Sequence, residues 1–295
     1  MLLLFASCAS FIERKAASST YQIMQRGQLA ARRLPDVELA RAAVPGGIVQ
    51  LAAFVEAYPK HRGFRAMYAE SLCQYALGFV FDDWDAASLG GRPDDARRLA
   101  ARLQGLLATC IELNVALLPA AWHSAVTDDA RWKGLLPSVK PADVPFLLHV
   151  ASAEAVRISL DPLAGGLARL DRVIATLTRC TEVSPGLRDA EGEILLGSLL
   201  AARSRFFKGP DGEAQFAAAR RVVGPSWILL DVMYARAVAV TRQDRVLFLR
   251  LLDAALATDL SRWPDRRLPN ELAKIKAERY RAAIETLIPP PDPGF

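Results

Sequence analysis

The chain has 295 residues, of which 52% are hydrophobic and 23% are charged, and its formal net charge is +5. This composition excludes an intrinsically disordered chain, and the length is enough for a large core in one compact domain or one short solenoid. The net positive charge does not by itself indicate a nucleic-acid-binding protein, because the arginines are scattered singly over most of the sequence.

The densest basic stretch lies near the C-terminus, where acidic residues alternate with the basic ones. The basic residues are Arg266, Arg267, Lys274, Lys276, Arg279 and Arg281, and the acidic ones are Glu271, Glu278 and Glu285. The mixed charge predicts a solvated helix face rather than a nucleic-acid-binding surface, and no nucleic-acid partner is expected.

The four cysteines, Cys8, Cys73, Cys110 and Cys180, are far apart, with no C-x-x-C pair and no histidine at ligand spacing. Neither a zinc site nor a disulfide framework is therefore expected in a chain of this length. The last three lie in apolar helical patterns, which favours small buried residues.

The N-terminus carries an apolar run, Met1 to Phe5, followed by Ala6-Ser7-Cys8. Small residues before a cysteine are typical of a lipoprotein signal, although no basic residue precedes the run and it is shorter than the usual stretch of about 7–15 residues. A start codon assigned inside the signal explains both departures. We expect residues 1–8 to be a truncated signal and Cys8 to carry lipid; the alternative is an ordinary helix start. No other stretch approaches the roughly 18 apolar residues that span a bilayer, so membrane contact is expected only through the lipid.

Apolar residues at three- and four-residue steps predict helices along most of the chain. Residues 9–60 are expected to hold one or two helices, and residues 62–81 form the next, ended by the acidic run Asp82-Asp83-Trp84-Asp85. The clearest stripe then follows, typical of an antiparallel helix pair. It consists of Leu99, Leu103, Leu106, Cys110, Leu113 and Leu117.

The connection at 119–142 interrupts this pattern with three prolines around Trp122 and Trp132. A connection of this length is often functional, and His123 could lie at the mouth of a binding site. Alternatively, the two tryptophans only hold a long loop against the helices.

Seven further helices are predicted, at about 143–158, 162–182, 188–207, 211–222, 226–240, 243–257 and 269–288. Asp161 and Pro162 are expected to begin the second of these, and Thr241 with Asp244 the sixth. No segment alternates like a strand. The predicted fold is all-α, with one domain over residues 9–288 and a proline-rich tail at 289–295.

Two Leu-Gly pairs, Leu77-Gly78 and Leu196-Gly197, match the first helix of a tetratricopeptide motif, where glycine lets the partner helix approach. Pro59 and Pro185 follow predicted second helices. The period of about 34 residues that defines the motif is not kept. We therefore predict an α-α superhelix of degenerate TPR-like hairpins.

Several motifs together resemble the T component of TRAP transporters, the TatT family, over residues 8–288. They are Tyr75-Ala76-x-Gly78-Phe79-Val80, Asp143-Val144-Pro145, Asp161-Pro162, Ser184-Pro185-Gly186, Tyr234-Ala235-x-Ala237-x-Ala239-Val240, Gln243-Asp244-Arg245 and Leu268-x-Asn270-x-x-Ala273. The chain departs from the family at Ala190-Glu191-Gly192-Glu193, where an Ala-His pair is usual, and at Phe206-Phe207-Lys208-Gly209, where a Leu-Gly-Gly turn is usual.

The resemblance implies a lipid-anchored periplasmic protein that partners the transporter's solute-binding protein and can form a homo-oligomer. It implies no enzymatic activity, cofactor or metal, and it transfers no ligand-contact residue. The aromatic residues Phe64, Tyr68, Tyr75 and Phe79 could line a groove for a small apolar ligand, although such a stripe is more often plain core.

Two alternatives belong to other classes. The first is a cytosolic α-solenoid adaptor without any transporter. The second is a magnesium-dependent enzyme resembling terpene synthases, in which Asp82 and Asn270 would begin the two metal motifs. It is disfavoured because Ala86 stands where a carboxylate is needed and Lys274 would repel the metal. The histidines His61, His123 and His149 belong to no catalytic motif, and His149 is expected in the core or a groove.

Overall fold

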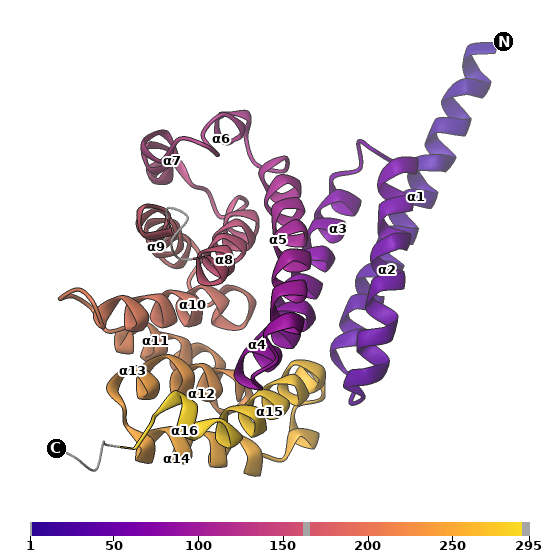
Figure 1. Cartoon of the computed structure of the whole chain (residues 1–295). Helices are drawn as coiled ribbons and strands as arrows, with labels where there is room; N and C mark the ends of the chain where they lie inside the picture. Colours follow the sequence, from indigo (N-terminus) through magenta and orange to yellow (C-terminus); the bar gives the residue numbers. More distant parts are fainter. Residues whose placement is uncertain (1, 162–165, 291–295) are drawn as a thin grey trace.

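The computed structural model describes the backbone of residues 2–161 and 166–290, and the side chains of residues 15–161 and 169–290. Every element in these ranges is helical, which confirms the all-α prediction. The predicted helix start at Asp161 and Pro162 falls partly outside the described residues. The α-helices (Figure 1) are α1 Leu2–Arg32, α2 Val37–Ala57, α3 Arg62–Tyr75, α4 Phe81–Leu89, α5 Pro93–Val115, α6 Ala120–His123, α7 Asp129–Leu135, α8 Val144–Leu160, α9 Gly166–Val183, α10 Leu187–Ser204, α11 Glu213–Val223, α12 Leu229–Tyr234, α13 Val240–Arg242, α14 Arg245–Ala257, α15 Arg267–Ala282 and α16 Ile284–Leu287.

The helices pack mainly against their neighbours in the chain. Helix α2 packs on α3, α5 on α3 and α8, α8 on α9, α9 on α10, α10 on α11, and α14 on α15. Helix α15 also contacts α1 and α2, so the C-terminal part of the fold returns to the N-terminal part (Figure 1). The same part of the fold brings Lys276 and Arg279 of α15 to Asp82 of α4, residues that lie almost two hundred positions apart in sequence.

Two π-helices interrupt the array, η1 Ala76–Val80 and η4 Ala235–Ala239. Each begins directly after a tyrosine, Tyr75 or Tyr234, within the two Tyr-Ala motifs identified in the sequence. Such π-helices are rare. Because η1 continues directly into α4, the acidic run at 82–85 does not end a helix, and that prediction was wrong.

The two Leu-Gly pairs have different roles. A side chain at Gly197 would lie 2.8 Å from the ring of Phe216 and 3.1 Å from the carbonyl of Gly212, so this glycine permits α10 and α11 to approach, as predicted. Gly78 lies in η1 and has no atom within 4 Å of the corresponding position, so the prediction was wrong there.

The start of α14 also differs from expectation. Asp244 is its N-cap and accepts a hydrogen bond from the backbone N–H of Leu247 at 2.9 Å, whereas Thr241 belongs to the preceding helix α13. The capping box predicted from Thr241 is therefore replaced by a single aspartate cap.

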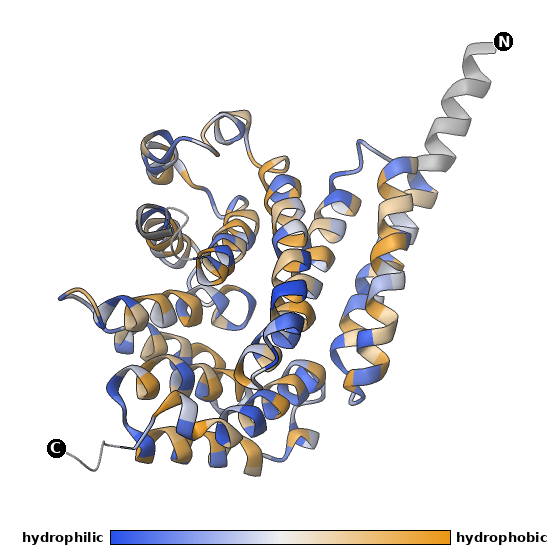
Figure 2. Cartoon of the chain, in the orientation of Figure 1, coloured by the Kyte–Doolittle hydropathy of each residue, from blue (hydrophilic) through white to orange (hydrophobic). Residues whose placement is uncertain are grey.

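Judged by length and composition alone, helix α2 could cross a bilayer. This contradicts the expectation that no stretch after the N-terminal run approaches that length. Hydrophobic residues lie along the helix in Figure 2. Some, such as Ile48 and Leu51, are buried against the fold, while Val49 is 71% exposed. Core helices and signal sequences meet the same criterion, so the finding by itself assigns no membrane span.

The connection at 119–142 is held tightly to the fold. Trp122 and Trp132 are buried and meet edge to face, with ring centres 4.8 Å apart. The indole N–H of Trp132 donates to Thr176 Oγ1 at 2.9 Å, and the Arg172 guanidinium lies over its ring. The two tryptophans therefore hold the long connection against α9, as the alternative interpretation predicted.

Candidate functional site

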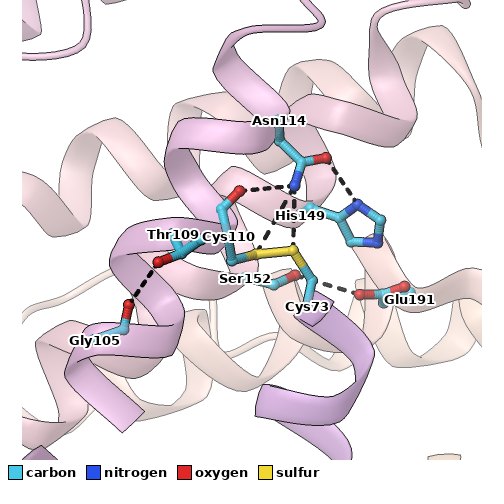
Figure 3. The surroundings of a disulfide bond; sticks show 8 residues. All are labelled: Cys73, Gly105, Thr109, Cys110, Asn114, His149, Ser152 and Glu191. Atoms are coloured by element: carbon cyan, nitrogen blue, oxygen red, sulfur yellow. Dashed lines mark hydrogen bonds between the residues drawn. A yellow bond between two sulfur atoms is a disulfide. The ribbon is translucent and has the colours of Figure 1, made fainter. Parts of the chain in front are cut away.

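A disulfide joins Cys73 on α3 to Cys110 on α5, with 5.3 Å between the Cα atoms (Figure 3). Both residues are fully buried. The expectation of no disulfide was therefore wrong for this pair, because the 37 positions between them are bridged by packing α3 directly on α5. Cys180 is a buried free thiol, as expected, and burial raises its pKa to about 12.

A chain of hydrogen bonds runs from the disulfide to His149. The side-chain amide of Asn114 donates to the Cys110 carbonyl at 2.8 Å and lies 3.2 Å from Cys73 Sγ (Figure 3). Its oxygen lies 3.1 Å from His149 Nδ1, so that nitrogen must carry the proton and donate. The other ring nitrogen, Nε2, is left as a buried acceptor with no hydrogen-bond partner among the described residues.

His149 is therefore held in its neutral form. Burial, and then the positive charge of Arg188, lower its pKa well below the usual value. This position in the core agrees with the prediction for His149. The role of Asn114 was missed, because an asparagine beside an apolar stripe gives no signal of complete burial.

The first turn of α10 has an unusual backbone. Arg188, Asp189 and Ala190 all have left-handed conformations, with φ of 56°, 60° and 60°. A left-handed residue other than glycine costs roughly 1–2 kcal/mol, so three in succession require strong local restraints. This turn shares Ala190 with the Ala190–Glu193 segment in which the sequence departs from the family pattern, and nothing in the sequence predicted its conformation.

Ion pairs restrain two of these three residues, Arg188 and Asp189. Asp189 accepts hydrogen bonds from Arg32 at 2.5 Å and from Arg266 at 2.6 Å. Arg188 pairs with Glu70 at 3.0 Å and with Glu191 at 3.2 Å. These six residues, which we call the central charged cluster, bring together α1, α3, α10 and the 3₁₀ turn η6 (Pro264–Arg266). Its three arginines balance its three carboxylates, so the cluster stabilises a junction and offers no free charge for a bound ion.

The acidic run on α4 meets the basic face of α15. Asp82 is 3% exposed and bonds to Lys276 and Arg279, and Asp85 accepts from Arg279 at 3.0 Å. Burial opposes ionisation of Asp82, but the hydrogen bonds and charges of Arg279 and Lys276 outweigh it and lower the pKa. The prediction that the basic stretch forms a solvated helix face was wrong for Lys276 and Arg279, because these residues pair with the buried carboxylates of α4.

This pairing also removes the metal-binding interpretation. The Asp82 and Asp85 carboxylates already face two cations, which would repel magnesium. Asn270 is fully buried and bonds to the backbone of Ile228 and Ser226. Over the residues that the structure describes, no group of three or more histidine, cysteine or acidic side chains could hold a metal ion.

The aromatic stripe on α3 and η1 divides into two separate groups. Phe64 is fully buried and packs against Phe54 with ring centres 5.1 Å apart. Phe79 is buried in another cluster with Leu268 of α15, and the Tyr75 hydroxyl accepts a hydrogen bond from Arg102. Phe64 and Phe79 are therefore core residues, whereas Tyr68 and Tyr75 are half-buried.

The remaining histidines have local structural roles. His61 caps α3, because its Nδ1 accepts a hydrogen bond from the backbone N–H of Phe64 at 3.2 Å. His123 lies 3.1 Å from the Leu118 carbonyl through its Nε2 atom, so it bonds to the residue that directly precedes the 119–142 connection.

A family model described as the TRAP transporter T-component matches residues 34–287. The chain belongs to the TRAP transporter T-component family. The match includes both Tyr-Ala motifs and most of the fold, from the end of α1 to α16. None of the curated proteins matches the chain. Family membership makes this chain a component associated with a TRAP transporter, in a family that is in general membrane-associated and periplasmic.

Proposed function

We propose that this chain is a non-enzymatic periplasmic lipoprotein that binds the solute-binding protein of its TRAP transporter. The observation that carries the proposal is the family match over residues 34–287. The charged groups around Asp82 and Asp189 pair with one another, so we assign no catalytic role to either cluster.

The disulfide supports the periplasmic location over the cytosolic adaptor. Disulfides form and persist in oxidising compartments such as the bacterial periplasm and are rare in the cytosol. Cys73 and Cys110 are both completely buried, so their bond braces the core rather than acting as an exposed redox group.

The lipid anchor at Cys8 is part of this proposal. The residues before Cys8 resemble the end of a lipoprotein signal. Cys8 belongs to helix α1, and its side chain is not among those that the structure describes. Labelling with radioactive palmitate, in a gene expressed with its native upstream codons, is expected to mark the wild-type chain and leave a Cys8→Ser variant unlabelled. Equal labelling, or none in either chain, would reject the anchor.

A homo-oligomer also remains a proposal, supported by exposed apolar residues on the first two helices such as Ile23 at 69% and Val49 at 71%. Light scattering on the purified Cys8→Ser chain measures the oligomeric state directly. A small apolar ligand gains no support from the aromatic stripe, because Phe64 and Phe79 are core residues.

Direct binding tests the main proposal. Isothermal titration of the Cys8→Ser chain with the solute-binding protein of the same transporter is expected to give saturable binding. A solute-binding protein from an unrelated transporter is the control and should not bind. Absence of binding to the matched protein, with or without its solute, would refute the proposed function.

A further inference from the structure

The α10–α11 hairpin ends in a loop with two exposed phenylalanines. Phe206 is 79% exposed and Phe207 is 50% exposed. We call residues 203–209 the hairpin tip; it projects from the side of the molecule beyond α10 (Figure 1). A pair of adjacent exposed phenyl rings is costly to leave in water and is typical of residues that become buried in a partner.

The tip is held in place rather than loosely attached. The backbone N–H groups of Phe206 and Phe207 both donate to the carbonyl of Arg203, at 3.0 and 3.1 Å. The Arg203 guanidinium lies over the Phe207 ring and pairs with Asp171 of α9 at 3.4 Å. Close to the tip, Gly212 at the start of α11 packs directly on the backbone of Gly197 in α10. A preorganised anchor loses little entropy on binding.

The charge around the phenyl rings is positive. Positions 194–210 include Arg203, Arg205 and Lys208 and no acidic residue. The first acidic residues after the tip are Asp211 and Glu213, and the carboxylate of each accepts a hydrogen bond of 2.6 Å from the Arg242 guanidinium. Arg205 and Lys208 are exposed and form no ion pair within the part of the chain that the structure describes, so both can meet carboxylates on a partner.

We propose that the hairpin tip docks into an apolar pocket bordered by carboxylates on the solute-binding protein, with Phe206 and Phe207 as its anchors. This proposal rests on the proposed function and names the contact surface for that partner. The two rings supply buried apolar area at the centre of the contact, while Arg205 and Lys208 supply charge complementarity and faster association.

The position of the tip favours a protein over a bilayer. The amino end of α1, which carries Cys8, lies at the opposite side of the molecule from the tip (Figure 1). A bilayer that holds that end through a lipid leaves the tip free to face the periplasm. In Figure 2 the ribbon at the end of the α10–α11 hairpin carries both hydrophobic and hydrophilic positions.

The test compares variants of the full chain, each with Cys8→Ser, in titrations with the solute-binding protein of the same transporter. Phe206→Ser with Phe207→Ser is expected to raise the Kd at least about tenfold, as for anchor residues in other interfaces. Its matched control is Val246→Ser, which changes a 78% exposed apolar residue on α14. Arg205→Glu with Lys208→Glu is expected to slow association, and the difference should shrink as salt is raised. Its control is Arg250→Glu, a charge change at another exposed position.

Each outcome decides a different point. Wild-type binding that the phenylalanine variant retains in full refutes the tip proposal while the proposed function stands. Failure of the wild-type chain to bind refutes both. The wild-type chain could bind mixed phosphatidylethanolamine and phosphatidylglycerol vesicles while the phenylalanine variant does not. If both chains then bind the solute-binding protein equally, the proposal is overturned in favour of a bilayer contact. If the phenylalanine variant differs from the wild-type chain only in its oligomeric state, the proposal is overturned in favour of a contact between the tip and a second copy of the chain.

Discussion

Replacing both disulfide cysteines, Cys73→Ala with Cys110→Ala, in a Cys8→Ser background is expected to lower the free energy of unfolding by about 4 kcal/mol. The estimate comes from the entropy that a cross-link removes from the unfolded chain when it closes a loop of this length. The loop spans 37 positions between α3 and α5. Since domains are stabilised by roughly 5–15 kcal/mol in total, the loss is a large fraction of the stability.

The hydrogen-bond chain beside the disulfide should survive this substitution. Asn114 keeps its 2.8 Å bond to the backbone carbonyl of residue 110 and its contact with His149. The expected loss is therefore close to the cross-link contribution plus the small cavity left by two sulfur atoms. Urea unfolding followed by circular dichroism, with and without reductant, measures it. In the variant, reductant should have no effect.

Counting thiols provides the decisive control. In the Cys8→Ser chain, unfolded without reductant, one free thiol is expected, from Cys180, because the other two cysteines are joined. The folded chain should resist dithiothreitol, since both sulfur atoms are buried. Three free thiols in a chain purified from the periplasm, or equal stability of the oxidised and reduced chains, would refute the reasoning.

Four further substitutions probe the ion pair, the buried histidine and the glycine contacts. Asp82→Asn should lower stability by about 3 kcal/mol in urea unfolding, because it leaves Arg279 with one fewer carboxylate in a buried site; a loss below about 0.5 kcal/mol would mean that the pair is effectively solvated. The pKa of His149 is lower in the folded chain than in the unfolded chain, so below about pH 6.5 the unfolded chain binds the additional proton. The contribution of His149 should therefore lower the free energy of unfolding by up to about 1.4 kcal/mol for each unit by which the pH falls. His149→Gln, which can still donate to the same amide, should remove this slope, and an unchanged slope would contradict the assignment. Gly197→Ala should cost about 1–3 kcal/mol through the contact with the neighbouring helix, whereas Gly78→Ala should be neutral or stabilising by up to about 1 kcal/mol; equal thermal shifts would contradict this difference.

Much of the helical architecture follows from periodicity and punctuation in the sequence. The pattern that begins at Leu99 predicts α5, and the prolines around Trp122 and Trp132 predict the break that follows it, but not the short helices α6 and α7 within that connection. Local signals suffice here, because a helix with one apolar face must bury that face on a neighbour. The family motifs are likewise local, and the family match confirms the resemblance they indicated.

The contacts between distant segments could not be predicted in this way. The apolar patterns placed Cys73 and Cys110 in buried faces, but their pairing depends on how α3 and α5 are aligned. The acidic residues of α4 and the basic residues of α15 each resemble a solvent-exposed face when taken alone. Only the return of α15 to the start of the array shows that Asp82 and Arg279 neutralise one another.

The left-handed turn at the start of α10 was missed for a different reason. Arg188, Asp189 and Ala190 have ordinary helical propensities, and the ion pairs that Arg188 and Asp189 make with distant helices are tertiary contacts that local sequence does not reveal. The exposed Phe206 and Phe207 were visible in the sequence as a departure from the family pattern. Their exposure and their fixed position became apparent only with the hairpin in place.

Purification of a tagged solute-binding protein from the native host's membranes tests the central claim most directly. The account predicts that the untagged chain co-purifies with it from the detergent-extracted membrane fraction, with Cys73 and Cys110 oxidised, and that Cys8→Ser moves the complex to the soluble periplasmic fraction. Recovery of the chain in the cytosol, with reduced cysteines and without the solute-binding protein, would contradict the account and favour the cytosolic adaptor.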